Sequence, residues 1–506
     1  MIKKTGFDNE RYLDEQSSAI LERINRLKGK LYLEFGGKIL WDYHASRVLP
    51  GYDPNIKIKL LKQLKDKIDI VLCIFAGDIE KGRIRGDFGI TYAADALKLI
   101  DDIREHGLDI LSVVITRFDN QPQAVNFKNK LENRNIKVYL HSATPGYPTD
   151  LDLIVSEKGY GSNPHIQTRN PIVIVTGPGP GSGKLATCLS QLYHDYQKGV
   201  RSSYAKFETF PIWNLPLKHP VNIAYEAATA DIADVNLIDP FHLSVYNQTA
   251  VNYNRDVEAF PLLKIILEKI MGDELPYRSP TDMGVNRAGF AIIDDALTQQ
   301  AAKDEIIRRY FRYNYEYLMG VEKKETVDKI MMLIEELGLH IEDRKVVAPA
   351  RKAAGERRNS RIDPVVSCGA AIELSGEAAV ITSKNSSLMS ASSSLILNAI
   401  KHLAEIPDKI HLLSPKIIDQ IKSLKKDILH SKQEILDLEE TLIALSMSAT
   451  TNPTAEIAME KLKDLAASEV HLTHIPTPGD EVGLRRLKVN LTTDGNFPSQ
   501  DLYAAG

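Results

Sequence analysis

Apolar runs and amphipathic stretches alternate along residues 68–176. Four runs rich in Ile, Val and Leu predict short strands, and two stretches with apolar residues at helical spacing predict helices. The strands are expected at 68–75, 110–115, 136–140 and 172–175, and the helices at 92–106 and 124–133. Apolar strands separated by helices are typical of a parallel sheet covered on both faces. Ligands of such sheets bind beyond the carboxyl ends of the strands, so the polar residues after each run are expected to face one crevice.

The fourth run leads into a loop with four glycines, and a lysine stands where a helical pattern begins. The loop spans Gly177–Lys184. Glycine lets the backbone approach an anion closely, so successive N–H groups can converge on it, and a helix N-terminus adds partial positive charge. The sequence therefore predicts a phosphate-binding loop. Its candidate phosphate-binding residues are Gly179, Gly181, Ser182, Gly183, Lys184 and Thr187.

The loop departs from the Walker pattern in two ways. That pattern has a glycine, four further residues, and then Gly-Lys followed by Ser or Thr. Counted from Gly177 the spacing is one residue too long, and Leu185 replaces the hydroxyl that would hold Mg²⁺. Ser182 and Thr187 are candidate replacements for that hydroxyl. A phosphate cradle that does not hydrolyse nucleotides and a tight turn needed only for strand–helix packing both stay open as interpretations.

Composition divides the rest of the chain. Three prolines within 211–220 indicate a break, and 258–271 and 303–338 then have helical patterns. A basic run at 344–361 follows, which either binds phosphate groups or is a solvated linker. We therefore expect a parallel-sheet α/β domain with the glycine loop at 1–215, a mostly helical region at 216–345 and a smaller C-terminal α/β domain at 346–506.

The C-terminal part repeats the alternation of strands and helices on a smaller scale. Strands are expected at 379–382, 411–413, 470–474 and 489–492, and a helix at 390–403. A long amphipathic helix is expected over 416–445. Because such a helix carries an apolar stripe, it is a candidate surface for a homo-oligomer.

Polar residues beyond the loop are candidates for chemistry. Glu208 and Asp239 are candidate ligands of Mg²⁺, which binds one or two carboxylates together with substrate phosphates. Arg255 is a candidate for holding a carboxylate or phosphate of a second substrate. Plainer interpretations stay open, with Glu208 as a solvated strand residue and Asp239 as a helix N-cap.

The last domain offers a second set of candidates. Cys368 is a candidate nucleophile, although free cysteines are more often small buried apolar residues. His471 and His474 are a candidate metal or acid–base pair. The candidate catalytic residues of the whole chain are Lys184, Glu208, Arg255, Cys368 and His474.

Composition excludes several classes of protein. The chain has 506 residues, 43% of them hydrophobic and 26% charged, with a net charge of −4, so two or three ordinary globular domains are expected. This charge attracts neither nucleic acid nor an anionic membrane, and no apolar run reaches the ~18–20 residues that span a bilayer. Three scattered cysteines indicate neither a disulfide framework nor a cysteine zinc site. A cytoplasmic protein is expected.

The chain resembles the uncharacterised bacterial family catalogued as domain of unknown function 1846. The segments that carry the resemblance are 179–184, 186–194, 206–215, 252–256 and 471–483. The resemblance implies a cytoplasmic, multi-domain α/β protein and transfers no established reaction. The strand–helix–strand order of the last domain is similar to the cytidine-deaminase-like fold. The zinc ligands and catalytic Glu of that chemistry are not found in the sequence, so zinc deamination is disfavoured.

Three hypotheses about function follow from these patterns. The first is an enzyme whose glycine loop holds a phosphorylated ligand or nucleotide with Mg²⁺ and which transfers a phosphoryl or other group. The second is a non-catalytic sensor or binding module for a phosphorylated metabolite or partner protein. The third is an enzyme centred on Cys368 and His474 in the C-terminal domain.

Overall fold

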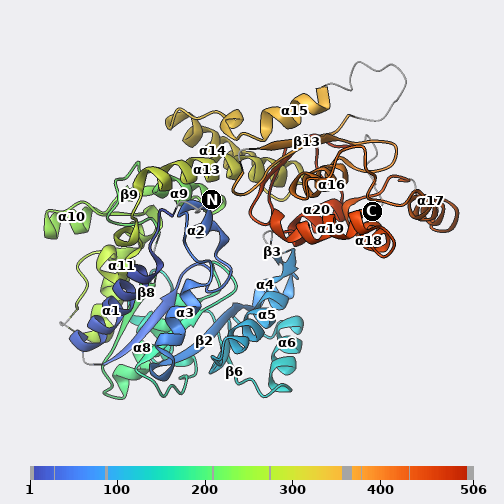
Figure 1. The fold of residues 1–506 in the computed structure, drawn as a ribbon. Helices are drawn as coiled ribbons and strands as arrows, with labels where there is room; N and C mark the ends of the chain where they lie inside the picture. The colour runs from blue at the N-terminus through green and yellow to red at the C-terminus, as the bar shows by residue number, and fades with distance from the viewer. Residues whose placement is uncertain are drawn as a thin grey trace. The chain divides into compact units, whose positions relative to one another are not determined.

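The computed structural model describes residues 5–27, 29–85, 89–207, 210–272, 275–355, 367–377, 379–431 and 433–498. The chain forms two compact units, one of residues 4–302 and the other of residues 303–506 (Figure 1). Each unit has its own sheet and its own core. The division into three parts at 215 and 345 stays a prediction.

The first unit is built on one sheet of seven strands that all run parallel to their neighbours. In spatial order the strands are β11 (Gly284–Val285), β8 (Ser202–Phe207), β1 (Lys30–Phe35), β7 (Ile172–Thr176), β2 (Ile68–Phe75), β5 (Ser112–Thr116) and β6 (Val138–His141). The four strands expected from the apolar runs all form and lie in this one sheet. The prediction of a large parallel sheet is confirmed.

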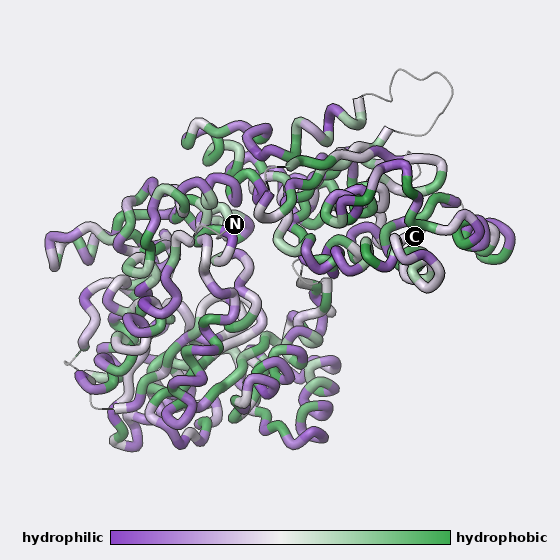
Figure 2. Tube along the Cα trace, viewed as in Figure 1, coloured by the Kyte–Doolittle hydropathy of each residue, from purple (hydrophilic) through white to green (hydrophobic). Residues whose placement is uncertain are grey.

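Helices cover both faces of the sheet, as the apolar strands require. The side chains of β7 alternate, so Ile172 and Ile174 join one core while Val173 and Val175 join the other. The first core is completed by α1 (Asn9–Leu27), α3 (Ile56–Gln63), α5 (Tyr92–Glu105) and α6 (Pro122–Glu132). The second is completed by α8 (Lys184–Gln197) and α11 (Asn254–Met271). Along these strands the trace is mostly green, for hydrophobic residues, in Figure 2.

The strand order creates a switch point next to the glycine loop. Strand β7 lies between β1 and β2. From β7 the chain passes through α8 to β8, beyond β1, whereas from β2 it passes through α4 (Ala76–Glu80) and α5 to β5 on the other side. Connections that leave two adjacent strands in opposite directions open a crevice at their carboxyl ends, and ligands bind there in open α/β sheets. The glycine loop follows β7 directly, so it lies at this switch point.

Smaller elements complete the first unit. The short helices are α2 (Tyr43–Val48), α9 (Pro220–Ala228), α10 (Pro240–Tyr246) and α12 (Pro280–Met283). Strands β9 (Asn236–Ile238) and β10 (Val251–Tyr253) form an antiparallel pair. Helix α13 (Asp295–Leu318) begins in the first unit and continues into the second.

The second unit has a mixed four-stranded sheet. The spatial order is β13 (Val380–Lys384), β12 (Gly369–Glu373), β14 (Glu469–Leu472) and β15 (Asn490–Thr493), with only β14 and β15 parallel. The helices of this unit include α14 (Lys324–Glu336), α15 (Val347–Gly355), α16 (Ala391–Leu403), α18 (Leu438–Ala449), α19 (Pro453–Glu460) and α20 (Pro478–Arg486). The sheet confirms a smaller α/β part, while the cytidine-deaminase-like fold stays a prediction.

Two sequence predictions about this unit are wrong. The single helix expected over 416–445 does not form. The segment instead contains α17 (Pro415–Ser423) with a π-helical turn to Ile428, then a break, and then α18. The break has a physical reason, since Asp437 and Glu440 form a capping box that starts a new helix. Residues 411–413 form no strand.

The first part of the basic run at 344–361 is folded and is not a solvated linker. Arg344 is buried and pairs with Glu469, and its guanidinium also donates to the carbonyl oxygens of Val470 (3.1 Å) and Asn490 (2.9 Å). Arg351 lies on α15 and holds Asp494 with two hydrogen bonds of 3.0 and 2.8 Å. Three further cations of the run, at 357, 358 and 361, lie outside the described residues.

Candidate functional site

The glycine loop joins β7 to α8 through two left-handed glycines. Gly181 has a φ of +71° and Gly183 a φ of +88°, conformations that residues with a side chain rarely adopt. Gly183 is the N-cap of α8, and Lys184 is the first helical residue. The backbone therefore turns sharply and delivers the lysine to the start of the helix.

Residues from neighbouring strands hold the loop in this conformation. The hydroxyl of Thr116, at the end of β5, donates a hydrogen bond of 2.8 Å to the carbonyl oxygen of Ser182. A Cβ on Gly183 would lie 2.6 Å from that hydroxyl oxygen, and one on Gly179 would lie 2.6 Å from the ring of Tyr92. The loop is thus packed against side chains from β5 and α5, which leave no room for a larger residue at these two glycines.

A second cation lies beside the loop. Arg117 follows β5 with a φ of +50° and donates a hydrogen bond to the carbonyl oxygen of Gly181. Its guanidinium stacks 3.4 Å above the centre of the Phe75 ring, at the end of β2. Stacking on an aromatic face suits the planar guanidinium and fixes its position. Arg117 therefore adds positive charge at the loop.

The donors of the loop are available to an anion. The N–H groups of Gly181, Ser182, Gly183 and Lys184 donate to no group among the described residues. The ammonium of Lys184 donates to the carbonyl oxygen of Gly179 (3.2 Å) and to Oγ of Ser182 (3.4 Å), so it lies over the loop. Together these groups are backbone donors next to two cations, the kind of groups that bind a phosphate.

The two candidate hydroxyls are both buried. Ser182 is only 3% exposed, and Thr187 is 1% exposed and lies on the side of α8 that packs on the sheet. The Thr187 hydroxyl is 3.5 Å from Sγ of Cys73 on β2. Burial raises the pKa of Cys73 to about 12, so this thiol is neutral and inert. Thr187 therefore packs between helix and sheet instead of joining the other loop donors.

Among the remaining candidates of the first unit, the two that the structure describes, Arg255 and Asp239, make no hydrogen bond or ion pair with the loop. Arg255 forms an ion pair of 3.2 Å with Asp234. Asp239 is fully buried, and its carboxylate accepts hydrogen bonds from the N–H groups of Phe241 and His242 and from Thr281. These bonds match the N-cap interpretation of Asp239. Glu208 lies outside the described residues.

Sequence reasoning missed Glu34, which lies near the end of β1. In the sheet Glu34 is the register neighbour of Val175, two residues before the loop, and of Lys206 on the other side. Its carboxylate accepts a hydrogen bond of 2.6 Å from the hydroxyl of Tyr204, whose pKa is raised by burial and then by the charge of Glu34. The alternation of polar and apolar residues over 30–35 is the signal of a strand that could have found it.

The candidates of the second unit are buried. Cys368 is 5% exposed and belongs to the core of that unit. His474 is 5% exposed, and burial, then the nearby His471, lowers its pKa to about 4. Nδ1 of His471 lies 3.0 Å from the Thr492 hydroxyl, and its Nε2 lies 3.4 Å from the carboxylate of Asp494. The roles of Cys368 and His474 in catalysis stay predictions.

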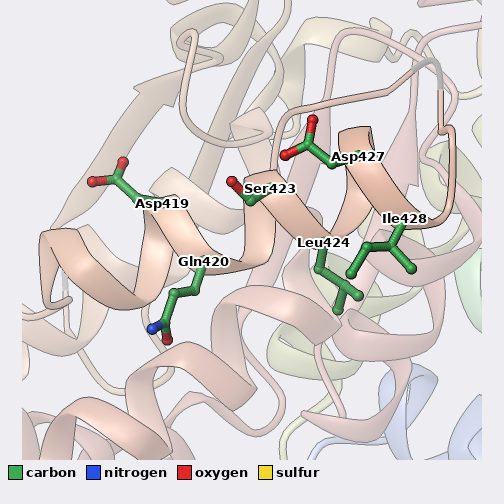
Figure 3. A pocket seen from close by; sticks show the side chains of 6 residues that line it. All are labelled: Asp419, Gln420, Ser423, Leu424, Asp427 and Ile428. Carbon is green, nitrogen blue, oxygen red and sulfur yellow. The ribbon is translucent and has the colours of Figure 1, made fainter.

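A hollow of about 310 Å³ lies on the second unit, but its lining comes from one side only, so it does not suit a ligand. Its lining side chains all belong to one helical stretch, α17 and the turn after it. Figure 3 shows Asp419, Ser423 and Asp427 along one row of this stretch and Gln420, Leu424 and Ile428 along the next. A site that encloses a ligand needs walls from more than one element.

Two features are absent from the residues that the structure describes. In that part of the chain, no group of three or more His, Cys, Asp or Glu side chains is arranged to hold a metal ion. The same residues include no helix whose length and apolar character would let it cross a bilayer.

Comparison with known proteins places the whole chain in one family. Residues 5–338 match "Domain of unknown function DUF1846, N-terminal", and residues 342–503 match "Domain of unknown function DUF1846, C-terminal". A "UPF0371 protein" of Clostridium tetani is 56% identical over 99% of both chains. A "UPF0371 protein" of Clostridium botulinum is 55% identical, again over 99% of both chains. The chain belongs to the DUF1846 family.

Proposed function

We propose that the glycine loop binds the phosphate of a phosphorylated ligand, such as a nucleotide. The observation that carries this proposal is the set of unpaired N–H groups of Gly181–Lys184, next to the ammonium of Lys184. Their position beyond the carboxyl end of β7, at the switch point of the sheet, supports it, because ligands of such sheets bind there.

We further propose that the bound ligand takes part in phosphoryl or group transfer with Mg²⁺. Mg²⁺ is held by one or two carboxylates together with the phosphates of its ligand. Both carboxylate oxygens of Asp239 accept hydrogen bonds, whereas Glu34 accepts one, from Tyr204, so Glu34 is the better candidate ligand in the described part of the first unit. Its place beside β7 supports this role. A non-catalytic sensor would use the same loop without any turnover.

A thermal-shift screen tests the binding step. The screen uses nucleotides and sugar phosphates with Mg²⁺, on the wild type, on Lys184→Ala, and on Lys65→Ala as a matched control. Lys65 is exposed and precedes β2, at the opposite edge of the sheet from the loop. A ligand at one hundred times its Kd stabilises the protein by about 2.7 kcal/mol. We expect this stabilisation in the wild type and in Lys65→Ala, and for nucleotides its loss in Lys184→Ala.

Product analysis then separates an enzyme from a sensor. Incubation of the stabilising ligand with Mg²⁺ gives a product only if the site transfers a group. Saturable stabilisation without any product would support the sensor, and the same melting temperature with every compound would overturn phosphate binding at the loop.

A further inference from the structure

A second polar cavity lies at the amino edge of the large sheet, the edge opposite to the glycine loop. It has a volume of about 360 Å³, within the range of small-molecule sites. Its walls come from three segments that are distant in the sequence, around Ser112 at the start of β5, Lys137 and Tyr139 at the start of β6, and Gln167 and Arg169 before β7. The cavity is therefore enclosed by separate elements.

The cavity has two cations that no acid neutralises. Lys137 and Arg169 are exposed, and neither forms an ion pair with a described residue. The ammonium of Lys137 lies 4.8 Å from the centre of the Tyr139 ring. The carboxylate of Asp69 is already used, because it accepts from the backbone N–H groups of Arg169 (2.6 Å) and Asn170 (2.9 Å). Asp69 thus anchors the segment that carries Arg169.

A buried hydroxyl in the same cavity has no partner. Ser112 is fully buried, and its Oγ makes no hydrogen bond with the described residues. In the sheet Val113 pairs with Val138, so Ser112 lies beside Lys137. A buried hydroxyl without a partner is unfavourable in a folded protein and calls for an explanation. An oxygen atom of a bound anion would satisfy it.

We propose that this cavity binds the phosphate group of a small metabolite. Arg169 and Lys137 would neutralise the two charges of a phosphate monoester, and Ser112 would donate to one of its oxygens. The guanidinium presents paired N–H donors that match phosphate, and the aromatic ring of Tyr139 offers a surface for the organic part of the ligand. This site is independent of the glycine loop and of the function proposed for it.

Isothermal titration calorimetry on the Lys184→Ala protein tests the proposal, because that variant lacks the ammonium of the loop. The probes are inorganic phosphate, glycerol 3-phosphate and, as a carboxylate control, succinate. We expect saturable binding of the two phosphates, an affinity at least tenfold weaker after Arg169→Ala, and no change after Lys130→Ala, which alters an exposed lysine on α6.

Ser112→Ala separates a ligand role from a structural one. The variant removes a hydroxyl without partners in the described structure, so we expect an equal or higher melting temperature and a severalfold weaker affinity for phosphate. Circular dichroism checks that each variant is folded. An equal affinity in Arg169→Ala, an absence of saturable binding, or tighter binding of succinate than of phosphate would overturn the proposal.

Discussion

The hydroxyl of Thr116 donates a hydrogen bond of 2.8 Å to the carbonyl oxygen of Ser182. Thr116 ends β5, whereas Ser182 belongs to the loop after β7, and β2 lies between these two strands. The bond therefore reaches across one strand and ties the loop to the carboxyl edge of the sheet. A loop that is fixed in this way keeps its donors in place before any ligand arrives, which lowers the entropic cost of binding.

Replacing Thr116 with valine keeps the shape of the side chain and removes the donor. We expect a loss of about 1 kcal/mol of unfolding free energy, the usual value of one hydrogen bond, and a severalfold weaker affinity for the phosphorylated ligand. Chemical denaturation and calorimetry measure the two effects. Thr116→Ser restores the hydroxyl and should recover the affinity, and a Thr116→Val protein that binds as tightly as the wild type would contradict this role.

Gly183→Ala tests how closely the loop is packed, with Gly199→Ala as its control. Both glycines have left-handed φ values, +88° and +71°, so each alanine has the same backbone cost of about 1–2 kcal/mol. Only Gly183 also meets Thr116, whereas a Cβ on Gly199 meets nothing within 4 Å. We expect Gly183→Ala to lose at least about 1 kcal/mol more by chemical denaturation, from steric overlap, and to lose ligand binding. Equal losses in the two variants would show that Thr116 does not pack on the loop.

The large sheet could be predicted because its inner strands are apolar on both faces. The run 68–75 forms β2 over the whole predicted range. By contrast, β1 alternates Lys30, Tyr32 and Glu34 with apolar residues. These polar side chains are accommodated in the sheet because Lys30 and Tyr32 hydrogen-bond Asp195, and Glu34 accepts from Tyr204. The alternation over 30–35 is compatible with a strand, but no local pattern shows those partners or places the strand inside the sheet. Tertiary contacts decided its structure.

The candidate site was predictable only in part, for a related reason. The glycines and Lys184 are consecutive, so the loop is visible in the sequence. Its supports, Thr116 and Tyr92, lie on other strands and helices, and their place at the loop depends on the strand order. A single sequence without related sequences does not give that order.

In the second unit, two arginines share one half-buried carboxylate. Glu469 pairs with Arg308 at 2.9 Å and also with Arg344. Burial alone would raise the pKa of Glu469, but the two guanidinium groups outweigh it and hold the pKa at about 2. Glu469→Gln leaves the buried Arg344 without its counter-ion, whereas Arg308 keeps Glu305, so we expect a loss of about 3–5 kcal/mol. The matched control is Glu373→Gln, whose partner Lys345 is exposed, with an expected loss below about 1 kcal/mol. Chemical denaturation of both variants measures these losses, and similar values for the two would contradict a buried network.

The same ion pairs predict acid sensitivity. An ordinary glutamate titrates near 4.5, whereas folded Glu469 titrates at about 2, so the unfolded chain takes up its proton first as the pH falls. The stabilisation that ionised Glu469 provides is complete above pH 4.5 and is lost as the pH falls toward 2. Urea denaturation at a series of pH values should show this loss in the wild type and a weaker one in Glu469→Gln. A wild-type stability that stays constant between pH 4.5 and 2 would refute this role of Glu469.

Protonation of His474 also destabilises the fold as the pH falls, and it begins at a higher pH than the protonation of Glu469. Burial, and then the nearby His471, lowers its pKa to about 4, whereas an unfolded histidine takes up a proton near 6.5. Stability from this residue is therefore complete above pH 6.5 and declines as the pH falls to 4. Proton NMR of the ring should show no titration of His474 between pH 7.5 and 5. A midpoint near 6.5 would show instead that the ring is accessible to water.

The most direct measurement of the central claim is hydrogen exchange at the backbone N–H groups of Gly181–Lys184, with and without pyrophosphate. These N–H groups have no partner among the described residues, so they should exchange quickly in the free protein. Bound phosphate would accept hydrogen bonds from them, and we predict slower exchange with pyrophosphate in the wild type and in Lys65→Ala but not in Lys184→Ala. Exchange that stays fast at saturating pyrophosphate, or slows equally in Lys184→Ala, would contradict a phosphate-binding loop.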